Sequence, residues 1–174
     1  PTIRHEAYEG YKGTRVKTDD ALVSQIKESR KVFAAFSIPT YEREGFEADD
    51  LLGTIAEEIK NTADVIIASG DMDTLQLVDD ERVRVYTLKK GINDTILYDE
   101  KAVIERFGFG PELIPDFKGL RGDPSDNIKG VPGIGEKTAT DLITNFGSIE
   151  KIYTALKKKN GEEAFLKKGI KARM

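Results

Sequence analysis

The sequence contains no cysteine and a single histidine, His5. The lack of cysteine excludes a disulfide scaffold, a thiolate metal site and a cysteine nucleophile together. One histidine argues against a zinc site built from several histidines and against a Ser-His-Asp triad. The longest apolar runs, 32–36 and 65–68, are far shorter than the ~20 residues of a membrane span. Residues 1–6 also lack the apolar segment of a secretion signal, so the sequence predicts a soluble intracellular protein without a membrane segment.

The 174 residues are enough for one domain with a hydrophobic core and a small appended unit. Charged residues are unevenly distributed along them. The formal net charge is −4. Residues 1–116 hold 15 Lys and Arg against 24 Asp and Glu, whereas residues 117–174 hold 12 against 7. An acidic first part and a basic last part are typical of separate metal-binding and polyanion-binding surfaces. An ordinary solvated surface is the alternative, and charge alone does not separate the two.

Hydrophobic periodicity predicts the main elements of the first half. We expect a helix over 18–36 that begins at Thr18 and carries Leu22, Ile26 and Phe33 on one face. The further expected elements are an amphipathic helix over 47–61, a strand over 65–68, a short helix over 74–78 and a strand over 83–88. Strands that alternate with helices favour an α/β fold with a mostly parallel sheet.

The second half follows a different pattern. After Tyr98 the sequence is almost entirely helical, with interruptions at glycine and proline. We therefore expect an α/β part over 1–98 and a helical part over 99–174, with the change lying between about 98 and 117.

Acidic residues form three clusters. The first stands at the start of the helix expected over 47–61, the second directly after the strand expected over 65–68, and the third in a turn of the basic part. The seven acids are Glu47, Asp49, Asp50, Asp71, Asp73, Asp123 and Asp126. Each cluster has an ordinary explanation on its own: placement at a helix start, capping of the next helix by Asp73, and hydrogen bonds within a turn. Asp71, at the carboxyl end of a strand where α/β proteins bind ligands, has no such ready structural role.

Taken together, the three clusters predict a metal centre. Ligand sets made only of carboxylates suit hard divalent ions, Mg²⁺ or Mn²⁺, and not Zn²⁺. Several carboxylates in one place repel one another unless cations bind among them. The reaction that uses such a cluster is two-metal hydrolysis of phosphodiesters. Convergence of the clusters in space is therefore the hypothesis, which sequence spacing alone does not establish.

The segment 130–137, GVPGIGEK, predicts an anion site. Gly133 and Gly135 flank one apolar residue just before a helix, so the backbone N–H groups of the turn and of the helix start can face a phosphate. Lys137 lies where it can contact a neighbouring phosphate, which indicates sequence-tolerant binding to a nucleic-acid backbone. A tight connection between two helices is the alternative.

Two other basic features are less specific. Lys12 and Arg15, three residues apart, can hold one phosphate, although their spacing alone favours an ordinary surface role. The three lysines at 157–159 are interpreted as a solvated face, and no site is assigned to them.

Four motifs occur in a fixed order along the chain. They are YKGTR at 11–15, EADD at 47–50, SGDMD at 69–73 and GDPSDNIKGVPGIGEKTA at 122–139. In this order they resemble the 5′→3′ exonuclease, or flap endonuclease, domain found at the N-terminus of bacterial DNA polymerase I and in stand-alone relatives. The resemblance covers nearly the whole chain, and the block at 122–139 is highly specific to this family.

The resemblance implies a fold and an activity. It implies a PIN-like α/β core with a helical arch, followed by a helical part with a helix–three-turn–helix (helix-hairpin-helix-type) DNA-binding motif. It also implies a metal-dependent 5′→3′ exodeoxyribonuclease and 5′-flap endonuclease of replication and repair, acting on branched or 5′-ended double-stranded DNA. A cytoplasmic, nucleoid-associated monomer is expected, and the family allows fusion to a DNA polymerase domain.

The resemblance also assigns roles to residues. The first of two Mg²⁺ or Mn²⁺ ions is expected at Glu47, Asp49 and Asp71, with Asp50 lining the same place. The ligands expected for the second ion, beside Asp71, are Asp73, Asp123 and Asp126. Lys12 and Arg15 correspond to cations that steer the scissile phosphate, and with Asp71 they form the expected catalytic set. The residues expected to grip duplex DNA are Gly130, Val131, Gly133, Ile134, Gly135, Lys137 and Thr138, and a K⁺ ion held by backbone carbonyls is implied at the same turn.

The family pattern begins upstream of Pro1, with a strand that bears one metal-binding aspartate and a second aspartate after it. The helices of the family also continue past Met174. The resemblance therefore implies a fragment shortened at both ends, without two ligands of the first metal. A branched-DNA-binding fragment without catalysis is the alternative. A PIN-type nuclease acting on RNA is a further alternative, which the block at 122–139 disfavours.

Overall fold

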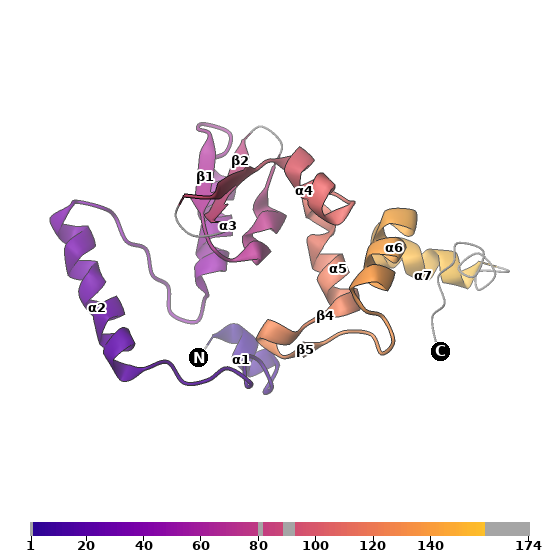
Figure 1. Ribbon diagram of the computed structural model, residues 1–174, viewed down its shortest axis with the longest axis horizontal. Helices are drawn as coiled ribbons and strands as arrows, with labels where there is room; N and C mark the ends of the chain where they lie inside the picture. Colours follow the sequence, from indigo (N-terminus) through magenta and orange to yellow (C-terminus); the bar gives the residue numbers. More distant parts are fainter. Residues whose placement is uncertain (1, 80–81, 89–92, 159–174) are drawn as a thin grey trace.

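Three short strands form a small sheet (Figure 1). The computed structural model describes residues 2–79, 82–88 and 93–158. Strand β1 (Val65–Ala68) pairs in parallel with β2 (Val83–Leu88), and β2 pairs antiparallel with β3 (Thr95–Tyr98). The strands predicted over 65–68 and 83–88 are confirmed, whereas β3 was not predicted. The sheet, expected to be mostly parallel, has one parallel and one antiparallel pair among the described residues, because β3 returns beside β2 after a short connection.

Helices and short turns make up most of the remaining described elements. The first half holds α1 (Ile3–Ala7), α2 (Asp20–Ala35), α3 (Ala48–Ile59) and the 3-10 helix η1 (Met72–Leu77). The second half holds α4 (Glu100–Phe107), η2 (Pro111–Leu113), α5 (Ile114–Arg121), η3 (Pro124–Asp126), α6 (Glu136–Phe146) and α7 (Ile149–Lys157), with a ribbon of β4 (Gly122–Asp123) and β5 (Ile128–Lys129). The helices predicted over 47–61 and 74–78 correspond to α3 and η1, while the ribbon was not predicted. Among the described residues, no helix combines the length and the apolarity needed to cross a membrane.

One face of the sheet is buried and the other is exposed. Ile67 of β1 and Val85 of β2 are register partners and are 4% and 1% exposed. They belong to the same core cluster as buried residues of α3 and η1. On the opposite face, Ile66 is 62% exposed and Leu88 is 52% exposed. Because successive side chains of a strand point to opposite faces, these strands carry apolar residues on both sides, as strands of parallel sheets do.

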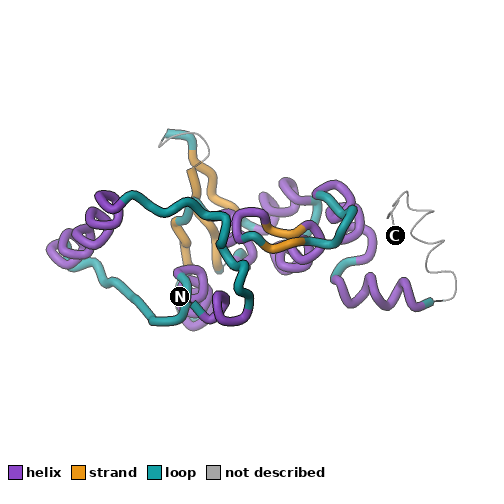
Figure 2. Tube along the Cα trace, turned by 90° about the horizontal axis from the view of Figure 1, so that it is seen from below, coloured by secondary structure: helices purple, strands orange, loops and turns teal. Residues whose placement is uncertain are grey.

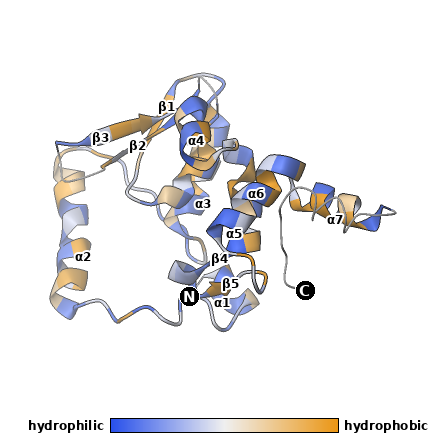
Figure 3. Ribbon diagram, turned by 45° about the vertical axis from the view of Figure 1, so that its right-hand side comes forward, coloured by the Kyte–Doolittle hydropathy of each residue, from blue (hydrophilic) through white to orange (hydrophobic). Residues whose placement is uncertain are grey.

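Helix α2 stands apart from the body of the molecule (Figures 1 and 3). Asp19 Oδ1 accepts a hydrogen bond from the N–H of Ala21 at 2.8 Å, so the prediction of Thr18 as the N-cap is wrong by one residue. The predicted apolar face of this helix remains exposed, with Ile26 at 56% and Phe33 at 41%. Figure 2 shows the long loops on both sides of α2 that return the chain to the body.

One hydrophobic core joins the sheet to the helical part. Its buried members run from Ala56 of α3 to Ile152 of α7. Phe107, Phe109 and Phe117 make ring contacts with centroids 5.3 to 6.1 Å apart, which tie the end of α4 to α5. The shared core therefore holds residues of the α/β part and of the helical part in a fixed relation.

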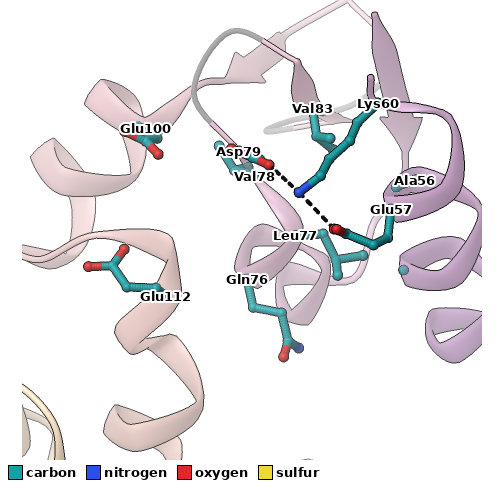
Figure 4. A pocket seen from close by; sticks show the side chains of 11 residues that line it. Ala56, Glu57, Lys60, Gln76, Leu77, Val78, Asp79, Val83, Glu100 and Glu112 are labelled. Atoms are coloured by element: carbon teal, nitrogen blue, oxygen red, sulfur yellow. Dashed lines mark hydrogen bonds and ion pairs between the residues drawn. The ribbon is translucent and has the colours of Figure 1, made fainter. Parts of the chain in front are cut away.

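A hollow of about 300 Å³ lies between α3, η1 and the start of α4 (Figure 4). Lys60, just after α3, points its Nζ at Glu57 Oε2 at 2.8 Å and at Asp79 Oδ2 at 2.7 Å. Glu100 and Glu112 line the opposite side of the hollow. None of the predicted site residues lines it. The Lys60 ion pairs instead fasten the end of α3 to the chain that follows η1.

Candidate active site

Two side chains outside the acidic clusters bridge acids that lie far apart in the sequence. The bridges run from Tyr11 to Glu47 and Asp126, and from Lys118 to Asp73 and Asp123. They connect the start of α3, the segment after β1 and the β4–η3 turn. The predicted clusters therefore lie in one neighbourhood at the junction of the α/β part and the helical part.

Tyr11 is buried between two of the predicted metal ligands. It is 5% exposed, and its hydroxyl lies 2.9 Å from Glu47 Oε2 and 3.0 Å from Asp126 Oδ2. Burial raises the pKa of this hydroxyl, and the two carboxylates raise it further, so Tyr11 stays protonated and can donate. Tyr11 belongs to the motif at 11–15, but no role was predicted for it. Its place beside Lys12 was the one available signal.

The cations of the same segment pair with the same acids. Lys12 Nζ donates to both oxygens of Glu47 at 2.8 Å, and Arg15 Nη2 donates to Asp126 Oδ1 at 2.7 Å. Burial raises the pKa of Glu47, but the hydrogen bonds from Lys12 and Tyr11 outweigh it and the pKa is lowered overall. Lys12 has a left-handed backbone with φ of 55°, fixed by the hydrogen bond from its N–H to the carbonyl of Asp126. Lys12 and Arg15, the two cations predicted to steer the phosphate, thus each donate hydrogen bonds to a predicted metal ligand.

Asp71 lies on the segment that follows β1, at the carboxyl end of that strand. Its N–H donates to Ser69 Oγ at 3.0 Å, and its Oδ1 accepts a hydrogen bond from the N–H of Asp73 at 3.0 Å. Asp71 is therefore the N-cap of η1, and the alternative explanation of the cluster, in which Asp73 caps this helix, does not apply. Thr74, fully buried, holds the same turn through its hydroxyl, which donates to the carbonyl of Asp71.

Asp49 shows that negative charge gathers at this place. Burial raises the pKa of Asp49, and the carboxylates of Asp71, Asp73 and Glu47 raise it further. Three acids from two segments thus oppose its ionisation, and the cation of Lys12 offsets only part of their effect. A bound divalent cation would relieve this repulsion.

Lys118 of α5 joins the remaining acids. Its Nζ donates to Asp73 Oδ1 and, at 2.7 Å, to Asp123 Oδ2. Asp123 is 7% exposed, and its Oδ1 accepts hydrogen bonds from the N–H and the hydroxyl of Ser125 at 3.0 and 2.6 Å. Burial raises the pKa of Asp123, but the hydrogen bonds from Lys118 and Ser125 lower it to about 2. Lys118 was not predicted as a site residue, since no sequence spacing relates it to Asp73.

Asp50 has a structural partner. Arg4 donates two parallel hydrogen bonds to its carboxylate, both at 2.7 Å, and the N–H of Glu47 donates to Asp50 Oδ2 at 2.9 Å. The hydrogen bonds from Arg4 lower the pKa of Asp50 to about 2. Asp50 therefore accepts a backbone hydrogen bond at the start of α3 and links α1 to α3 through Arg4. This agrees with the alternative from the sequence, in which the acids of the first cluster stabilise a helix start.

The Arg4–Asp50 pair predicts a pH dependence of stability. Because the pKa of Asp50 is lower in the folded chain than in the unfolded chain, its contribution is complete above pH 4 and is lost as the pH falls toward 2. Asp50→Asn keeps an acceptor for the N–H of Glu47 but loses about 1 kcal/mol at pH 7, since Arg4 is partly exposed. Urea unfolding in EDTA at several pH values measures this. A difference between the two proteins that stays constant from pH 7 to pH 2 would contradict the prediction.

The donor set fits a divalent ion in kind. All candidate ligands are carboxylates, which suit Mg²⁺ or Mn²⁺. Over residues 2–79, 82–88 and 93–158, however, no three acidic or histidine side chains are grouped so that they could hold one metal ion. Five of the seven carboxylates pair instead with the side chains of Arg4, Lys12, Arg15 and Lys118; these five are Glu47, Asp50, Asp73, Asp123 and Asp126.

The ribbon β4–β5 gives Gly130 a structural role. Gly122 has φ of 84°, and its backbone crosses that of Gly130 so closely that a Cβ on Gly130 would overlap the carbonyl group of Arg121 and the nitrogen of Gly122. The N–H of Val131 donates to the carbonyl of Leu120 at 2.9 Å, just beyond the crossing. Gly130, predicted to contact DNA, is thus required by packing.

Gly133, Gly135 and Lys137 are among the exposed residues of the predicted DNA-binding turn. Gly133 has φ of 82°, and Gly135 is the N-cap of α6 with open space where a Cβ would lie. Lys137, in the first turn of α6, is exposed. Of the other predicted contact residues, Val131 is 44% exposed, Ile134 packs against the core and Thr138 is half-buried. An exposed helix start next to an exposed lysine is a suitable place for a phosphate.

Two family models together match the whole chain. The 5′-3′ exonuclease, N-terminal resolvase-like domain matches residues 1–108, and the 5′-3′ exonuclease, C-terminal SAM fold matches residues 109–174. The chain is 45% identical over 163 residues to DNA polymerase I of Bacillus caldotenax and 43% identical to that of Bacillus subtilis. These matches cover 93% of this chain but 18% of each relative, so the chain spans about a fifth of their length.

Solved structures agree with the family models. The T5 D15 protein co-crystallised with metal ions is 26% identical, with a TM-score of 0.72 over 96% of this chain and 67% of that one. The bacteriophage T5 D15 flap endonuclease in a pseudo-enzyme-product complex with DNA and metal ions has the same identity and TM-score. The catalytic core of Rad2, at 22% identity and a TM-score of 0.54, shares the fold.

Proposed function

The chain belongs to the 5′-3′ exonuclease family, and from this premise we propose that it is a divalent-metal-dependent 5′→3′ exonuclease and 5′-flap endonuclease that hydrolyses DNA phosphodiesters in replication and repair. The observation that carries the proposal is the bridging of the three acidic clusters. Tyr11 links Glu47 to Asp126, and Lys118 links Asp73 to Asp123. The raised pKa of Asp49, to which Asp71 and Asp73 contribute after burial, is consistent with carboxylates that gather to bind cations.

The proposed ligands divide between two Mg²⁺ or Mn²⁺ ions. Glu47, Asp49 and Asp71 would hold the first, with Asp50 beside them. The residues that would hold the second are Asp73, Asp123 and Asp126. Two bound ions would supply an attacking water of lowered pKa and would stabilise the charge on the leaving oxygen. Before any ion binds, Tyr11 and Lys118 keep acids from distant segments side by side.

Cations of the N-terminal segment would orient the substrate. Lys12 and Arg15 are proposed to hold the scissile phosphate, to which they can turn from Glu47 and Asp126. We assign α2 to the helical arch. A groove of about 880 Å³ between α2 and the segment 40–48 reaches Glu47, which is consistent with a DNA strand entering along this helix.

The helical part would grip duplex DNA. The turn 130–138 presents Gly135 and Lys137 to solvent at the start of α6, and backbone contacts of this kind are independent of base sequence. A K⁺ ion at the carbonyls of this turn is part of the proposal. We keep 1–98 as the catalytic part and 99–174 as the DNA-binding part, whereas the family models divide at 108 and 109.

The proposed partner is branched or 5′-ended double-stranded DNA. The relatives named above are DNA polymerases, so a polymerase domain in the same protein is part of the proposal. We propose a monomer that works in the cytoplasm on nucleoid DNA.

A second candidate function is binding of branched DNA without cleavage. One observation favours it: within the described ranges, no three acids are grouped around a point where an ion would sit. In this alternative the pairs that Lys12 and Lys118 make with acids are permanent structural contacts.

Cleavage of a labelled 5′-flap duplex separates the two functions. With Mg²⁺ the 174-residue chain is expected to release the flap. The same reaction with EDTA is expected to give no product, because no divalent ion is then available to lower the pKa of the attacking water. Binding of the flap duplex is measured in the same buffers by fluorescence anisotropy. Tight binding without Mg²⁺-dependent product would support the non-catalytic alternative.

A further inference from the structure

Lys118 lies between two acids that the proposed function assigns to one metal ion. Its ammonium contacts Asp73, from η1, and Asp123, from β4. The side chain of Lys118 is 23% exposed, and that of Asp123 is 10% exposed. The ammonium makes an ion pair with each of the two carboxylates. A positive charge thus already stands between carboxylates from different segments.

The hydrogen bonds of Asp123 divide between its two oxygens. Oδ1 accepts from the N–H and the hydroxyl of Ser125, whereas Oδ2 accepts from Lys118. Ser125 therefore holds the carboxylate in place whether or not Lys118 is present. Oδ2 is left directed at whichever cation stands between Asp73 and Asp123.

A divalent ion and the ammonium cannot occupy this place together. An ion coordinated by these carboxylates uses oxygen lone pairs directed at the point that the ammonium fills. The two cations would also repel each other at so short a separation. Ion binding to Asp73 and Asp123 therefore requires Lys118 to move away.

We propose that Lys118 is a positioning residue that acts as an internal, displaceable cation. Without metal it holds Asp73 and Asp123 together, and a divalent ion must displace it in order to bind. The inference rests on the proposed function, since it concerns the same carboxylates. Its consequence is that Lys118 lowers the affinity for divalent ions while it stabilises the metal-free fold.

The chain offers a matched control in Lys60. It also bridges two acids, Glu57 at 2.8 Å and Asp79 at 2.7 Å, and its side chain is 22% exposed. These acids line the hollow of Figure 4 and lie outside the candidate site. Lys60→Met therefore removes the same kind of ion pair without removing a competitor for metal.

The test measures Mn²⁺ binding directly, from the electron paramagnetic resonance signal of free Mn²⁺. Lys118→Met is expected to bind Mn²⁺ about 10-fold more tightly than the original chain, a size typical of changes next to metal ligands. Lys118→Arg, which keeps the charge, and Lys60→Met are expected to bind like the original chain. Lys118→Met is also expected to melt at a lower temperature in EDTA, and saturating Mn²⁺ should reduce this difference.

Several outcomes would overturn the proposal. Unchanged or weaker Mn²⁺ binding by Lys118→Met, or equal tightening by Lys118→Arg, would leave Lys118 with a structural role only. The same conclusion would follow if Mn²⁺ did not reduce the difference in melting temperature between Lys118→Met and the original chain. If the original chain binds Mn²⁺ and Lys118→Met binds it equally well, the proposed function stands and only the role of Lys118 fails. If neither protein binds Mn²⁺, both fail.

Discussion

Asp71→Asn is expected to reduce flap cleavage about 100-fold or more and Mn²⁺ affinity at least about 10-fold, with the fold unchanged. Asp71 stands at the carboxyl end of β1, and its carboxylate contributes to the field that raises the pKa of Asp49. The amide oxygen of asparagine still accepts the hydrogen bond from the N–H of Asp73, so the cap of η1 is kept. What is lost is the negative charge, which is the part that a metal ion requires.

Asp99→Asn is the matched control for this change. Asp99 caps α4 by accepting a hydrogen bond from the N–H of Ala102 at 2.8 Å, and it is exposed. Both variants should melt like the original chain and bind the flap duplex in EDTA with equal affinity. Full cleavage and full Mn²⁺ affinity in Asp71→Asn would remove the basis for the two-metal assignment.

Gly130→Ala is expected to disrupt the ribbon and with it the duplex grip. A Cβ at this position meets backbone atoms of Arg121 and Gly122, which cannot turn aside as a side chain can. We expect a loss of stability of about 3 kcal/mol, hence a melting temperature lower by roughly 10 °C. Thermal unfolding by circular dichroism measures it, and duplex affinity should fall together with the fold.

Gly135→Ala separates fold from binding in the same turn. The space around Gly135 is open and its φ of −93° suits any residue, so the variant should melt like the original chain. Its added methyl group stands where a phosphate would approach α6, and duplex affinity should fall about 10-fold, the equivalent of one hydrogen bond to a charged group. If Gly135→Ala binds duplex DNA normally, the helix start is not the phosphate site. If Gly130→Ala melts normally, the packing role of Gly130 is wrong.

Sequence periodicity predicted the helices and strands whose formation depends mainly on their own residues. The apolar run Val65–Ala68 forms β1, as predicted, and the helix predicted from the spacing of Leu51, Leu52 and Ile55 is α3. The glycine at 135, expected just before a helix, is the N-cap of α6. Strand β3 was missed, because a four-residue segment becomes a strand only by pairing with β2, and such pairing leaves no periodic signal of its own.

The candidate acids could be named from the sequence, but their partners could not. Asp71 was singled out because no structural role was evident for it, and that reason is wrong, since Asp71 is itself the cap of η1. Tyr11 and Lys118 act by joining distant segments, and such contacts arise only from tertiary structure. Gly130 was assigned to DNA on its motif, whereas the structure shows a backbone crossing at which a Cβ would overlap Arg121 and Gly122.

The links between the N-terminal segment and the η3 turn set the order in which the molecule is completed during synthesis. The N–H of Lys12 donates to the carbonyl of Asp126, the side chain of Asn127 donates to the carbonyl of Gly10, and Arg15 reaches Asp126. At roughly 5–20 residues per second, a ribosome needs about 6 to 23 s to make the intervening chain. Throughout that interval Lys12 and Arg15 have no η3 turn to contact. The nascent chain therefore acquires its assembled acidic centre only when the first residues of its helical part have been made.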